Sequence, residues 1–131
     1  MVEMIQGFYL VNQGGETLAS LELGNFHADE ALLGGFLSAV NTVSRMMVGS
    51  EVRELVMGRF RLVISSSGDL LVVLVCDDRS DDVHTVIGKI RNTLVQYDHR
   101  VSDDLLQEIG NILRTDSSRL GYLEDWATKM F

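Results

Sequence analysis

The sequence has no proline, only one cysteine and no cluster of basic residues, and each of these gaps narrows the possible functions. The single Cys76 cannot form a disulfide within the chain, and no signal-peptide pattern is present, so we expect a cytosolic protein. The formal net charge is −8. Because phosphate groups are bound by clustered Lys and Arg, neither nucleic acid nor an anionic membrane surface is an expected partner.

Close sets of catalytic or metal-binding side chains are also missing. His27, His84 and His99 are far apart in the sequence, and residues 76–82 (CDDRSDD) lack the alternating ligands and central glycine of a calcium loop. Helix capping by Ser80 and its neighbouring acids explains that acidic run better. Neither glycine pair leads into the Gly-Lys-Ser/Thr of a phosphate loop. We therefore expect no enzyme activity, no metal and no cofactor.

With 131 residues, of which 46% are hydrophobic, the chain is long and apolar enough to form one folded domain. The patterns predict an α+β fold in the order ββαβββαα plus a short C-terminal helix, with helices on both faces of a five-stranded antiparallel sheet. The domain spans 1–131, with a core at about 4–114 and a helical extension at about 118–131. The expected strands are 4–12, 16–23, 51–57, 60–66 and 70–76, and the expected helices are 29–49 and those starting near Ser80 and Ser102.

The stretch at 29–49 is the most informative, because Arg45 is the only charged residue between Ala31 and Val48. A helical wheel gives an apolar arc of about half the circumference, wider than an ordinary core stripe of about 100°. That arc includes Leu32, Phe36 and Leu37 and is expected to face the sheet. The opposite face is small and polar. A membrane span is not expected, since polar side chains lie within the stretch and the strands need a sheet to pack on.

Two interpretations of the small face remain open. It could be the unusually small solvent face of an ordinary core helix, or a second buried face on which another subunit packs. We favour the second, because mid-helix glycines cost about 1 kcal/mol each relative to alanine. The predicted dimer or partner interface joins this face to the edge strand and consists of Gly34, Ser38, Asn41, Thr42, Arg45, Arg53 and Leu55.

The C-terminal extension has an apolar stripe of its own, formed by Leu120, Leu123, Trp126 and Met130. We expect this stripe to dock on the domain. The alternative is that it anchors a partner, since exposed aromatic residues often do so.

The element order and three stretches of sequence resemble the longin-like branch of the longin/roadblock superfamily, which has a profilin-like fold. They are GFYLVNQGGETLAS at 7–20, LLGGFLSAVNTVSRMMVG at 32–49 and EVRELVMGRFRLVISSSGDLLVVLVCD at 51–77. The resemblance covers residues 4 to about 114. It implies a sheet order of 2-1-5-4-3, dimerisation through the first helix and third strand, and a platform on which a small GTPase sits.

Two classes of function follow. The favoured one is a non-enzymatic, cytoplasmic scaffold that forms a homodimer or a heterodimer with a related subunit and binds or regulates a small GTPase in membrane-trafficking-type processes. The alternative is a small-molecule sensor of PAS-like architecture. The nearly all-aliphatic core argues against the sensor, because ligand pockets need polar groups that orient the ligand.

Overall fold

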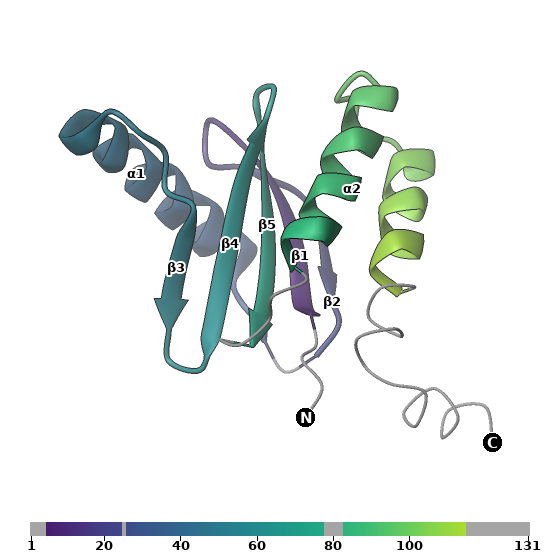
Figure 1. Ribbon diagram of the computed structural model, residues 1–131, viewed down its shortest axis with the longest axis horizontal. Helices are drawn as coiled ribbons and strands as arrows, with labels where there is room; N and C mark the ends of the chain where they lie inside the picture. Colours follow the sequence, from purple (N-terminus) through teal and green to yellow (C-terminus); the bar gives the residue numbers. More distant parts are fainter. Residues whose placement is uncertain (1–4, 25, 78–82, 115–131) are drawn as a thin grey trace.

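A computed structural model describes residues 5–24, 26–77 and 83–114 of the chain. Five strands form one antiparallel sheet in the order β2-β1-β5-β4-β3, which confirms the predicted fold class and strand order (Figure 1). Both β4 and β5 are reached through two-residue turns that start at Gly58 and Gly68, whose positive φ suits such hairpins. The strands are β1 Ile5–Asn12, β2 Thr17–Glu22, β3 Glu54–Met57, β4 Phe60–Ser67 and β5 Leu70–Asp77.

The helices cover the two faces of the sheet unequally. One face carries α1 (Glu30–Val48), and the other carries α2 (Val83–Gln96) beside a third helix at 103–114 (Figure 1). The predicted helix start at Ser102 is confirmed, since its hydroxyl accepts the backbone N–H of Leu105 at 3.2 Å. The predicted cap at Ser80 and the C-terminal stripe from Leu120 to Met130 lie outside the described residues.

The apolar core is divided by the sheet into two clusters. The larger joins Phe8, Leu74 and other strand residues to the inner stripes of α2 and the 103–114 helix. The smaller joins Tyr9, Val73 and their neighbours to only two side chains of α1, Leu33 and Leu37. Because β5 contributes to both clusters, it is buried along almost its whole length, as its continuous apolar run predicts.

Both ends of α1 are set by local sequence, as predicted. The Asp29 carboxylate accepts the backbone N–H of Leu32 at 3.0 Å, which caps the first turn. Gly49 adopts a left-handed conformation with φ 73° and donates its N–H to the carbonyl of Arg45, which ends the helix. By length and composition, α1 is apolar enough to cross a membrane. Its packing on the sheet and hairpin instead makes it part of the domain.

Candidate functional site

The small face of α1 lies against the chain's own β1–β2 hairpin, which corrects the predicted orientation of the helix. A Cβ atom on Gly34 would lie only 2.3 Å from the carbonyl oxygen of Gly15. Ser38, one turn later, donates its hydroxyl to the carbonyl of Gln13 at 3.0 Å. The glycine therefore permits close approach of a neighbouring backbone. That backbone belongs to the same chain, so these contacts of Gly34 and Ser38 lie within the domain. Their assignment to a partner interface stays a prediction.

Asn41 also belongs to the inward face of α1. Its side chain is 7% exposed, and its Oδ1 accepts the backbone N–H of Val52 at 3.2 Å. This bond ties the helix to the segment that leads into β3. Asn41 therefore has a structural role within the domain, and its predicted place at a partner interface stays a prediction. Thr42 is exposed at the border of this face and donates its hydroxyl to the carbonyl of Ser38 at 2.9 Å.

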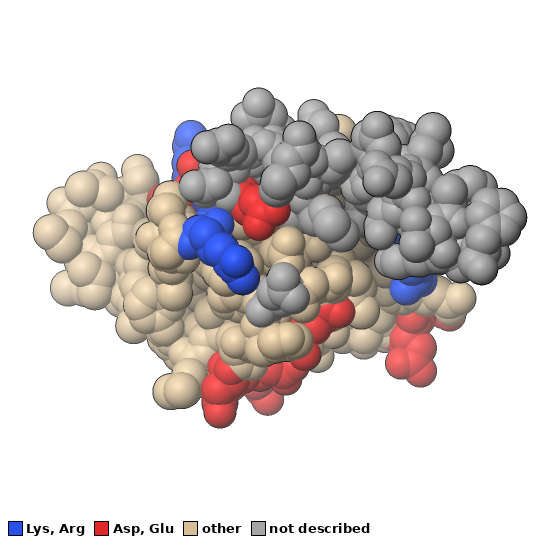
Figure 2. Space-filling model, turned by 90° about the horizontal axis from the view of Figure 1, so that it is seen from below, with Lys and Arg blue, Asp and Glu red and all other residues tan. Residues whose placement is uncertain are grey.

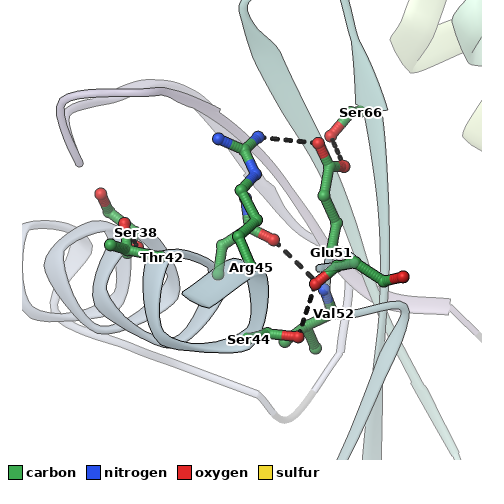
Figure 3. Close-up of polar contacts among 9 residues, drawn as sticks. Ser38, Thr42, Ser44, Arg45, Glu51, Val52 and Ser66 are labelled. Carbon is green, nitrogen blue, oxygen red and sulfur yellow. Dashed lines mark hydrogen bonds and ion pairs between the residues drawn. The ribbon is translucent and has the colours of Figure 1, made fainter. Parts of the chain in front are cut away.

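The end of α1 is held by a polar junction centred on Glu51 (Figure 3). Arg45 Nη2 lies 2.7 Å from Glu51 Oε1, and the other carboxylate oxygen accepts the hydroxyl of Ser66 on β4. Ser44 donates its hydroxyl to the carbonyl of Ser50 at 2.7 Å. The hydrogen bonds from Ser66 and Arg45 lower the pKa of Glu51. Arg45 is exposed, but its guanidinium already has a partner within the chain.

Most of the apolar arc of α1 faces solvent. We call this surface the outer face of α1: it consists of Leu32, Phe36, Val43, Met46 and Met47. Leu32, Met46 and Met47 are 74%, 81% and 78% exposed. On a wheel of 100° per residue the five side chains fall within about 100°, so they form one continuous stripe. Figure 2 shows no charged side chain at the left end of the molecule, where the end of α1 projects.

The third strand continues this apolar surface at the edge of the sheet. Leu55 and Met57 lie on the α1 side of β3, because they pair with Leu62 and Phe60 of the smaller core cluster. Leu55 is half-buried, while Met57 and Arg53 are exposed. Among the described residues β3 pairs only with β4, so the opposite edge of β3 is free. Leu55 thus lies on the same side of the sheet as the outer face, and the interface role of Leu55 and Arg53 stays a prediction.

The chain resembles solved structures, of which two are described below, whereas no protein-family model and no curated protein matches it. Myxococcus xanthus MglB is 19% identical, with a TM-score of 0.54 over 74% of this chain and 85% of that one. The Roadblock/LC7 domain from Streptomyces avermitilis is 11% identical, with a TM-score of 0.60 over 76% and 89% of the two chains. The chain has a longin/roadblock-type fold. At these identities the likeness shows the fold alone.

In this longin/roadblock-type fold, the width of the apolar arc of α1 was a sequence signal for the outer face. Helical periodicity alone could not show which part of that arc is exposed. The apolar arc of α1 is about twice as wide as one sheet-facing stripe needs. One border of the arc, Leu33 and Leu37, packs on the sheet, and the remainder is exposed. The extra width of the apolar arc indicated a second contact surface on α1. Only the position of the β1–β2 hairpin shows which part of the arc forms that surface.

Proposed function

We propose that this chain is a non-enzymatic, cytosolic interaction module that pairs through the outer face of α1 and the free edge of β3, and that the pair contacts a small GTPase in trafficking-type processes. The observation that carries the proposal is the outer face itself, five large apolar side chains in one stripe on a helix that is otherwise well tied to its domain. Soluble domains rarely leave such a stripe uncovered unless it is a binding site.

The geometry suits a two-fold symmetric pair with this chain or with a related subunit. In such a pair the same patch is used twice, so a stripe of Leu, Phe, Val and Met packs on a copy of itself. Full burial of one such side chain contributes about 1.5–3 kcal/mol, and part of the sum offsets the entropy lost on association. Two β3 strands placed edge to edge would also satisfy their unpaired backbone groups.

The GTPase part of the proposal rests on the longin/roadblock resemblance. A pair joined through α1 and β3 would present two copies of the domain side by side, as the resemblance implies for a GTPase platform. Affinity capture from the native organism's lysate, run with GDP and with a non-hydrolysable GTP analogue, tests it. We expect a small GTPase to be retained, with its yield differing between the two nucleotides.

The pairing is tested by two matched substitutions on different helices. Val43 on the outer face is 51% exposed, and Val95 on α2 is 60% exposed. Val43→Glu places a charge in the proposed dry contact, which costs several kcal/mol when the charge has no partner. Val95→Glu makes the same change outside the contact. Light scattering should give a dimer for the wild type and for Val95→Glu, and a monomer for Val43→Glu with unchanged circular dichroism. A monomeric wild type at high concentration would refute self-pairing.

A further inference from the structure

A groove of about 650 Å³ lies beside α2, on the side of that helix away from the 103–114 helix. One wall is a single stripe of α2, formed by His84, Ile87, Gly88 and Arg91 at helical spacing. The other wall and the floor come from residues 50–53 and 63–66. The groove therefore belongs to α2, β4 and the segment before β3, whereas the outer face of α1 lies on the opposite side of the sheet.

The groove has an apolar base and, at its walls, two arginine side chains without an ion-pair partner among the described residues. Ile87 and Val63 form its base, where they are only 6% and 2% exposed, and a Cβ on Gly88 would meet no atom within 4 Å, so the groove is open there. Neither the Arg53 nor the Arg91 guanidinium has a polar partner among the residues that the structure describes. The carboxylate of Glu51, by contrast, is already taken by Arg45 and Ser66.

Glu54, which contacts His84 at the wall of the groove, also has partners within the chain. Glu54 Oε1 lies 3.5 Å from His84 Nε2 and 3.7 Å from the Nε atom of Arg61. Within the described part of the chain, the side chains of Arg53 and Arg91 are therefore not neutralised by carboxylates, although the whole chain has a net charge of −8. An occupant that is apolar on one side and has an acidic group beside that side would complement the groove.

We propose that the occupant is the chain's own C-terminal segment, residues 118–131, which docks as a helix by its stripe of Leu120, Leu123, Trp126 and Met130. These four positions fall within about 120° of a helical wheel, and Glu124 borders the stripe about 40° from Leu120. The segment thus offers apolar side chains to the open space at Gly88, above Ile87 and Val63, with a carboxylate beside them for Arg91 or Arg53. This inference is independent of the pairing through α1.

The length of the segment suits this path. The 103–114 helix runs back antiparallel to α2, so it ends near the first turn of α2 (Figure 1). Seventeen residues follow Arg114. Three extended residues span about 10 Å, which is close to the width of a helix, and fourteen helical residues span about 21 Å. The chain can therefore pass the start of α2 and lie along the groove.

Trp126 is the only tryptophan, so the full-length protein reports its own docking. We expect Trp126 emission to be blue-shifted relative to the denatured chain and to be independent of protein concentration. Gly88→Phe fills the groove and Arg91→Glu reverses its charge, so each should shift the emission toward the denatured value and increase acrylamide quenching. Gly88→Ala, which leaves the groove open, and Arg100→Glu, a charge reversal at an exposed site outside it, should not.

Three results would overturn the proposal. The first is an emission maximum in the wild type equal to that of the denatured chain. The second is a buried Trp126 that Gly88→Phe and Arg91→Glu leave unchanged while Val43→Glu exposes it, which would place the segment on the outer face of α1. The third is a blue shift that appears only as the protein concentration rises. Circular dichroism of each variant checks that the domain is folded. We expect Gly88→Phe to fold, because phenylalanine is more favourable than glycine in a helix.

Discussion

At the scale of single residues, the two adjacent glycines of α1 have opposite environments. Gly34 lies under the carbonyl of Gly15, where a Cβ would be 2.3 Å from the oxygen. Gly35 is exposed, and a Cβ there would meet no atom within 4 Å. Sequence alone predicts the same cost for both, since glycine is unfavourable in any helix interior. The cost is offset only at Gly34, where the close approach of the hairpin requires the missing side chain.

This contrast gives a matched pair of substitutions. Gly34→Ala should destabilise the domain by about 1–3 kcal/mol, because the methyl group forces the hairpin away from α1. Gly35→Ala should stabilise it by up to about 1 kcal/mol through helix propensity. Urea unfolding at one fixed protein concentration measures both. Equal effects of the two substitutions would mean that the hairpin does not press on Gly34.

At the scale of elements, local signals predicted the bounds of α1 but not its orientation. Asp29 and Gly49 act on the first and last turns, so their roles can be read from neighbouring residues. The face that α1 presents to the sheet depends on the β1–β2 hairpin, whose residues are far from most of the helix in sequence. Hydrophobic area alone favoured Phe36 inward, whereas contacts with the hairpin and with Val52 place Ser38 and Asn41 there. Phe36 is instead 45% exposed.

The junction that joins α1 to β4 should make stability depend on pH. Its two hydrogen bonds hold the pKa of Glu51 below the usual value. Such a carboxyl stabilises the fold above its unfolded pKa of about 4.3, and this stabilisation is lost as the pH falls through the lower, folded pKa. Glu51→Gln should therefore be less stable than the wild type at pH 7.

The difference in stability between Glu51→Gln and the wild type should become smaller as the pH falls below about 4, because the wild type then loses the contribution of the Glu51 carboxylate. Thermal unfolding across this range measures the effect. Glu108→Gln, on the exposed surface of the 103–114 helix, serves as the control and should follow the wild-type curve. A Glu51→Gln variant that parallels the wild type at every pH would show that the junction adds nothing to stability.

At the scale of the whole molecule, the sheet order followed from the family resemblance. The strands were predicted close to their observed positions, except that β3 starts at Glu54 and not at residue 51. The interface could not be derived in the same way, because an exposed apolar stripe and a buried one have the same periodicity. Burial distinguishes them: α2 and the 103–114 helix are fixed by their inner stripes, whereas α1 contributes Leu33 and Leu37 to the core and leaves five large side chains outside.

If the outer face of α1 is covered by a second copy, folding and association are linked, and the melting temperature must depend on concentration. Each tenfold rise adds about 1.4 kcal/mol to the stability of a dimer that dissociates on unfolding, or about 0.7 kcal/mol per chain. For a domain of this size that corresponds to an increase of about 2–4 °C. Differential scanning calorimetry of the wild type and Val95→Glu should record this increase. Val43→Glu should melt at one temperature across the same concentrations, since a monomer has no association to lose. A wild-type melting temperature that stays constant over a hundredfold range of protein concentration would contradict self-association, and the outer face would then bind a different partner.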